Sequence, residues 1–122
     1  MEKNKIYKWK IKILKSKQYK INIGITTIDF MEKSQGFSNG WYLFCNDFKL
    51  YSGPPHSFSQ KNINLKKNDE IIIVMDMCKG TLKFITNNED IGDSYTDIPL
   101  DESLFPSITL YNKDDSVEII KV

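Results

Sequence analysis

The sequence contains no arginine and no alanine, and it has a single histidine and two cysteines. The side chains that are positively charged at neutral pH are therefore all lysines, 17 in number. Without arginine, the chain has no planar bidentate donor for phosphate, carboxylate or guanine. Without alanine, it lacks the strongest helix former, whereas isoleucine is abundant and 12% of the residues are aromatic. This balance favours β-strands.

Histidine and cysteine are too few and too scattered for the common metal and catalytic sites. Cys45 and Cys78 lie in apolar runs without a CxxC spacing, so we expect buried, reduced thiols. His56 follows a Gly-Pro-Pro loop, and nothing in the sequence brings it to Cys78 as a catalytic pair. One histidine and two scattered cysteines cannot form a structural zinc site. The sequence also contains no Gly-rich phosphate loop. We therefore predict a protein that is not an enzyme and needs no metal or cofactor.

Residues 74–97, VMDMCKGTLKFITNNEDIGDSYTD, allow two interpretations. Asp76, Cys78 and Lys79 could form a nucleophilic centre, with a calcium loop in the carboxylates that follow. Those carboxylates lack the ligand spacing of an EF-hand, however. The alternative is two strands joined by a tight turn, with Glu89 to Asp97 as a solvated acidic loop. We favour this second interpretation.

Charge is unevenly distributed along the chain. Residues 1–20 carry eight lysines against one glutamate, whereas residues 86–118 carry nine carboxylates against one lysine. The lysines alternate as on an ordinary solvated strand face, and the acidic half would oppose a polyanion, so we expect no nucleic-acid partner. No apolar run reaches the length of a membrane span, and the N-terminus lacks the apolar region of a signal peptide. We expect a cytoplasmic monomer without a membrane partner.

Apolar residues recur at every second position rather than at helical spacing. Tyr7, Trp9, Ile11 and Ile13 alternate with lysines, which predicts a half-buried strand. About eight to ten short strands separated by turns predict an all-β antiparallel sandwich or barrel. Beyond the run around Ile21 to Ile25, the other predicted strands are Trp41–Cys45, Lys49–Ser52, Glu70–Asp76, Thr81–Thr86, Leu104–Leu110 and Val117–Val122.

Four blocks in register resemble the SPRY (B30.2-like) domain family. The blocks are the Trp9 and Gly24 strands, the Asn39-Gly-Trp segment leading to Tyr51, the hairpin from Glu70 to Phe84, and Leu104-Phe-Pro-Ser-Ile with the closing strand at Val117. The resemblance covers residues 7–120. The separate N-terminal PRY segment of many tripartite-motif proteins is missing.

The resemblance implies a bent antiparallel two-sheet β-sandwich, predicted as a single domain over residues 1–122 that is either a whole protein or one module of a larger one. It also implies a non-enzymatic module that binds a protein or peptide through loops at one edge and a shallow concavity, often as an adaptor or substrate receptor. The loops at 14–20, 27–40, 45–48 and 111–115 would supply the contacts.

Two branches of the family suggest partner-binding residues. Positions that touch the partner in the tripartite-motif branch match Asn22, Phe44, Asn46, Tyr111 and Asn112. In the branch with a SOCS box, a threonine and a Trp-Gly pair bind an acidic Asn-rich peptide.

Thr27 matches the threonine of that second branch, but Asp114-Asp115 replaces the Trp-Gly pair. The arginine that this branch requires is also absent, so its peptide specificity is not carried over. A carbohydrate-binding sandwich is the alternative, because lectin-like folds share the architecture and use exposed aromatic and Asn side chains. A structural scaffold without a discrete site is a third possibility.

Overall fold

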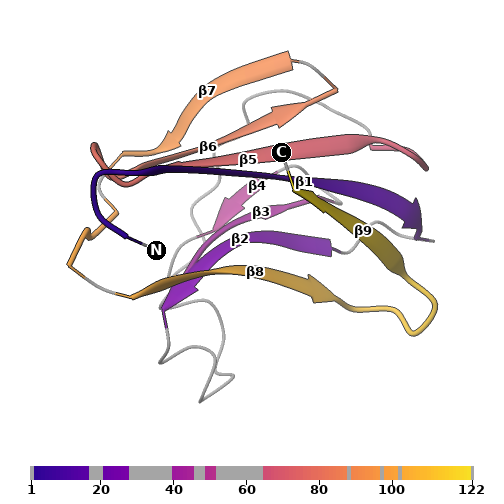
Figure 1. The fold of residues 1–122 in the computed structure, drawn as a ribbon. Coiled ribbons are helices and arrows are strands. Elements are labelled where there is room, and N and C mark those ends of the chain that lie inside the picture. The colour runs from indigo at the N-terminus through magenta and orange to yellow at the C-terminus, as the bar shows by residue number, and fades with distance from the viewer. Residues whose placement is uncertain are drawn as a thin grey trace. The chain divides into compact units, whose positions relative to one another are not determined.

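The computed structural model describes residues 2–16, 21–27, 40–45, 49–51, 65–87, 89–96, 98–101 and 103–121. These residues form nine β-strands and no helix, and the strands are arranged in two antiparallel sheets (Figure 1). Each sheet belongs to its own compact unit of the chain. Within the described ranges, no helix could cross a membrane. The prediction of an all-β fold with two antiparallel sheets is confirmed.

The first unit holds a five-stranded sheet in the order β7-β6-β5-β1-β9. Its neighbouring strands are all antiparallel. The strands are β1 (Ile6–Lys15), β5 (Glu70–Asp76), β6 (Thr81–Thr86), β7 (Glu89–Tyr95) and β9 (Ser116–Lys121).

The alternating sequence of β1 produces one buried and one solvated face. Ile11 and Ile13 are fully buried and Trp9 is nearly so, whereas the lysines between them point to the opposite face. Trp9 pairs with Ile73, and Ile11 pairs with Ile71, so the buried face continues onto β5. Because β1 extends to Lys15, the predicted contact loop at 14–20 begins inside the strand, and its residues 17–20 lie outside the described ranges.

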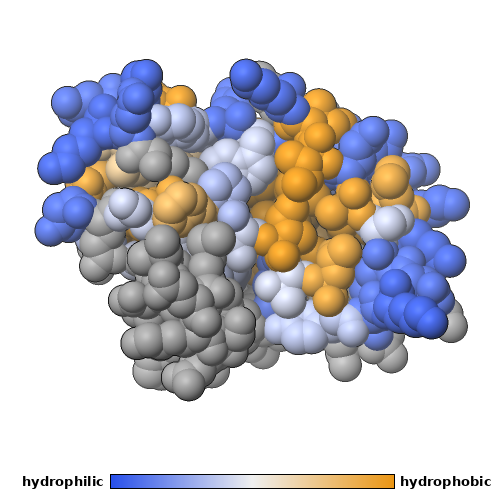
Figure 2. Space-filling view, turned by 60° about the horizontal axis from the view of Figure 1, so that its bottom comes forward, coloured by the Kyte–Doolittle hydropathy of each residue, from blue (hydrophilic) through white to orange (hydrophobic). Residues whose placement is uncertain are grey.

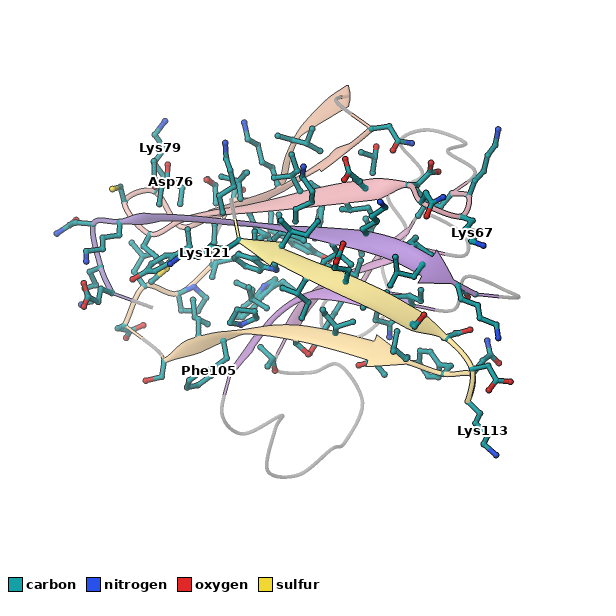
Figure 3. All side chains as sticks on the ribbon, turned by 45° about the vertical axis from the view of Figure 1, so that its right-hand side comes forward. Lys67, Asp76, Lys79, Phe105, Lys113 and Lys121 are labelled. Carbon is teal, nitrogen blue, oxygen red and sulfur yellow. The ribbon has the colours of Figure 1, made fainter. Side chains whose placement is uncertain are left out.

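The turn between β5 and β6 settles the interpretation of residues 76–80. One carboxylate oxygen of Asp76 accepts hydrogen bonds from the backbone N–H groups of Cys78 and Lys79, at 2.8 and 3.1 Å. Gly80 has a φ of 72°, which L side chains rarely adopt, and its N–H donates to the Asp76 carbonyl. Asp76 and Lys79 lie together at this turn in Figure 3. Asp76 therefore caps a hairpin, as the second interpretation predicts.

Two sequence predictions in this region are wrong. Cys78 is exposed at the turn rather than buried, because it stands where the chain reverses at the end of the sheet, whereas Cys45 is buried as predicted. Glu89 to Tyr95, predicted within a solvated loop, forms β7 and pairs with β6, with register shifts along the ladder.

We expect the Asp76 cap to give a pH-dependent contribution to stability. The hydrogen bond from the Cys78 N–H, and then that from Lys79, lowers the pKa of Asp76 below its ordinary value. A lowered folded-state pKa stabilises the fold above the unfolded pKa, and this stabilisation is lost as the pH falls through the folded pKa. Asp76→Ala should therefore be less stable than wild type near neutral pH, and the difference should narrow at about pH 2. Denaturant unfolding at both pH values measures this, and a difference that does not change with pH would contradict it.

The second unit holds a four-stranded sheet in the order β4-β3-β2-β8. Ile21, Ile23 and Ile25 on β2 are fully buried on one face, as are Leu43 on β3 and Leu104 on β8. This aliphatic row is what an alternating strand predicts for a core face. The strands are β2 (Ile21–Thr27), β3 (Gly40–Phe44), β4 (Lys49–Tyr51) and β8 (Leu104–Leu110).

Candidate functional site

The opposite face of the four-stranded sheet carries polar and aromatic residues, which we call the polar face. On β2 it holds Asn22 and Thr26, each with only 1% of its surface exposed. Their partners in register place further residues on the same face, because directly opposed residues of antiparallel strands point the same way. The described side chains of the polar face are Asn22, Thr26, Tyr42, Phe105, Ser107 and Thr109.

Asn22 and Tyr111 meet at one end of this face although they are 89 residues apart in the chain. The side-chain amide of Asn22 donates a hydrogen bond to the hydroxyl oxygen of Tyr111 over 2.8 Å. The register explains the contact, since Asn22 pairs with Thr109 on β8 and Tyr111 stands two residues further on. Asn22 also pairs with Phe44 on β3. Three of the predicted binding positions are therefore at the same end of the sheet.

Tyr111 combines a fixed hydroxyl with an exposed ring. Its side chain is 51% exposed, although its hydroxyl is held by an amide that is almost completely buried. A buried amide needs hydrogen-bond partners, so this contact stabilises both residues. The hydrogen bond therefore anchors the hydroxyl end of a ring that is largely exposed at the surface.

The turn after Tyr111 is closed by its own hydrogen bonds. The Asn112 amide donates to an Asp115 carboxylate oxygen over 3.3 Å, and the Asp115 N–H donates to the Asn112 carbonyl over 3.1 Å. Asn112 is half-buried, whereas Asp114 is exposed at the tip. Figure 3 shows Phe105 and Lys113 at opposite ends of β8, so the turn lies at the Tyr111 end of the strand.

Tyr42 and Ser107 form a second polar contact that the sequence did not predict. Tyr42 is fully buried, and its hydroxyl donates to the Ser107 hydroxyl over 3.5 Å. Burial raises the pKa of Tyr42, although hydrogen bonds with Ser107 and Thr26 act in the opposite direction. Gly24 pairs with Tyr42 on one side and with Ser107 on the other, which places the two hydroxyl-bearing side chains on the same face.

The remaining predicted positions are separated from this cluster or lie outside the described ranges. Thr27 ends β2 and pairs with Leu104, at the opposite end of the strand from Asn22. Asn46 lies outside the described residues, as do residues 28–39 and 46–48 of the predicted contact loops at 27–40 and 45–48. The structure therefore brings together Asn22, Phe44 and Tyr111, with Asn112 and Asp114 in the adjoining turn.

The described side chains of the polar face are uncharged at neutral pH. They offer amide, hydroxyl and aromatic groups. Within the described part of the chain, no three His, Cys, Asp or Glu side chains are grouped to hold a metal ion. Uncharged hydrogen-bonding groups beside an exposed aromatic ring suit contacts with a polar surface of another molecule.

The Asn22–Tyr111 hydrogen bond should be measurable as stability. Tyr111→Phe leaves a buried amide donor without its partner, which costs about 1–3 kcal/mol. Asn22→Ala removes the buried amide, and water can take its place as the hydrogen-bond partner of the exposed tyrosine. The double variant has no unsatisfied buried amide, so it should be no less stable than Tyr111→Phe. Urea unfolding of the three variants measures this coupling. Fully additive losses would show that the hydrogen bond contributes nothing.

A family model for the SPRY domain matches residues 6–121. The structure is similar to the crystal structure of the SPRY domain of human HERC1, with a TM-score of 0.79 and 21% sequence identity. That alignment covers 99% of this chain and 77% of the HERC1 chain. No curated protein matches the sequence.

Proposed function

Because the chain belongs to the SPRY domain family, we propose that it is a non-enzymatic interaction module that binds a segment of another protein at the Tyr111 end of the four-stranded sheet. SPRY domains are generally protein-interaction modules, which supports the class of function. We further propose that it acts as a monomeric adaptor or substrate receptor in the cytoplasm.

The exposed ring of Tyr111, held by the buried Asn22, is the observation that supports this site most strongly. Tyrosine supplies a large amphipathic contact area, and tyrosines are enriched among the residues that dominate binding energies. A side chain that is already fixed loses little conformational entropy when a partner packs on it. The hydrogen bond from Asn22 therefore prepares Tyr111 for binding.

The neighbouring groups indicate the kind of ligand. Ser107 and Thr109 of the polar face are half-buried, and their hydroxyls can bond to peptide N–H and C=O groups, but they offer no charge to a strongly acidic or basic ligand. Asp114 is exposed at the rim, and the chain has no arginine to clamp a carboxylate. We therefore propose a mostly uncharged polypeptide segment as the ligand.

Selection from a displayed library of random peptides tests this proposal. We expect wild type to enrich a family of related peptides, and Tyr111→Ala to lose them. Ile6→Ser is the matched control, because Ile6 is 62% exposed but lies on β1 in the other unit. Enrichment that is equal for wild type and Tyr111→Ala would contradict the site. Binding on a glycan array with no enriched peptide would indicate a carbohydrate-binding protein instead.

A further inference from the structure

Among the described strands, β9 forms one edge of the five-stranded sheet. It hydrogen-bonds to β1 on one side, and among the described strands none pairs with its other side. An unpaired edge presents a row of backbone N–H and C=O groups to which a further strand can bond. Hydrophobic residues are also present at the molecular surface (Figure 2). Among the described residues, the most exposed large one is Ile119 of β9, at 64%.

The other three terminal strands carry features that block added strands. The edge strand β8 contains Pro106, β4 has only three residues, and β7 combines acidic residues and Gly92 with register shifts. The six residues of β9 include neither proline nor glycine. Among the described strands, β9 is therefore the terminal strand with the fewest features that block an added strand.

Ile119 shows that the core face of the sheet continues to this edge. Ile119 pairs with Ile11 of β1 and shares its face, yet Ile11 is fully buried while Ile119 is mainly exposed. An apolar side chain from an added strand could cover Ile119. The binding free energy gained would be proportional to the apolar area that is buried. Backbone hydrogen bonding and the burial of Ile119 thus both favour the addition of a further strand at β9.

We propose that β9 binds an extended segment of another protein, which adds to the sheet as a sixth, antiparallel strand. Main-chain hydrogen bonds would supply affinity, and the alternate side chains would supply specificity. β9 belongs to the first unit of the chain, whereas Tyr111 belongs to the second.

The charges on β9 define the pattern of the partner strand. Glu118 stands opposite Lys12 of β1, but among the described residues no ion pair joins them, and Lys121 has none either. Glu118 and Lys121 flank Ile119 and Ile120. Opposite charges on directly opposed residues stabilise antiparallel pairs. Read in its own direction, the partner would place an acidic residue opposite Lys121, two apolar residues, a basic residue opposite Glu118, and an apolar residue opposite Val117.

A second copy of this chain does not satisfy that pattern. Residues an odd number of positions apart lie on opposite faces of a strand, so Glu118 and Lys121 point to opposite faces. A two-fold antiparallel pair of β9 strands opposes residues of the same face only. It can never place Glu118 opposite the Lys121 of its partner, which favours a foreign strand over a homodimer.

Two synthetic peptides test the proposal on the whole chain. The first is Thr-Asp-Val-Ile-Lys-Val-Thr, and the second exchanges its aspartate and lysine. We expect the first to bind wild type about tenfold more tightly, because the exchange reverses two charge pairs. The double variant Glu118→Lys, Lys121→Glu should reverse this preference. Ile119→Lys should weaken binding at least about tenfold, whereas Ile6→Lys should leave it unchanged.

Amide hydrogen exchange of wild type locates the bound peptide without any variant. The proposal requires slower exchange in Ser116–Lys121 when the first peptide is added. Unchanged exchange in β9, equal affinity for the two peptides, or protection confined to the Tyr111 end of β8 would each overturn it. Protection of β9 that depends on protein concentration without peptide would indicate a second copy and would overturn it as well.

Discussion

Gly24→Ala is expected to destabilise the protein by about 3 kcal/mol or more, at the upper end of overpacking effects. A Cβ at this position would lie 1.9 Å from the carbonyl oxygen of Trp41 and 2.9 Å from the Cα of Tyr42. Both atoms belong to the backbone of β3, so no side-chain rotation can make room. Either β3 must move away from β2 or the ladder between them must break.

The requirement at Gly24 is for space rather than for an unusual backbone conformation. Gly80 is the only glycine with a positive φ among the described residues, and Gly24 sits within a regular strand. Ile25→Val on the same strand is the control, because it removes one methylene from a fully buried side chain and should cost about 1 kcal/mol. Urea unfolding gives both values. A loss at Gly24 no larger than that at Ile25 would show that the two strands are not in such close contact.

Phe84→Ala is expected to cost about 3–5 kcal/mol, the usual range for removal of a buried phenylalanine. Phe84 is fully buried, with 0% of its surface accessible to solvent. It pairs with Ile73, which in turn pairs with Trp9. Its ring therefore belongs to the buried face that runs across three strands. Truncation leaves a cavity that the neighbouring strands can fill only in part.

The adjacent residue Ile85 provides the control for Phe84. Ile85 points to the opposite face and is half-buried, so Ile85→Ala should cost less than half as much. Calorimetric or denaturant unfolding separates the two substitutions. Because a slip of one residue in register would exchange the two faces, equal losses would contradict the observed pairing of β5 with β6.

The sequence predicts strands where the side-chain pattern and the turn chemistry agree. The strands Glu70–Asp76 and Thr81–Thr86 were predicted with the boundaries that the structure has. A continuous apolar run, an alternating run and the Asp76 and Gly80 turn residues specify this hairpin locally. β7 could not be predicted in this way, because its acidic residues and Gly92 disfavour strands. Pairing with β6, which lies earlier in the chain, overrides that local preference.

The candidate site depends on contacts that a single sequence does not specify. The family resemblance selected Asn22 and Tyr111, but their hydrogen bond depends on the register between β2 and β8. Pairing of strands so distant in the chain is decided by the packing of the whole sheet. The same register separates Thr27 from Asn22, although the resemblance assigned both to partner binding. Tyr42 and Ser107 gave no signal beyond an ordinary alternating strand.

The affinity of a peptide selected on wild type tests the central claim most directly. Isothermal calorimetry should give a Kd that Tyr111→Ala raises by about thirtyfold, the factor that corresponds to a binding hot spot of about 2 kcal/mol. Ile6→Ser should leave the Kd unchanged, and urea unfolding should show that both variants are folded. If Tyr111→Ala is folded and binds the peptide as tightly as wild type does, the Tyr111 end of the four-stranded sheet is not the binding site.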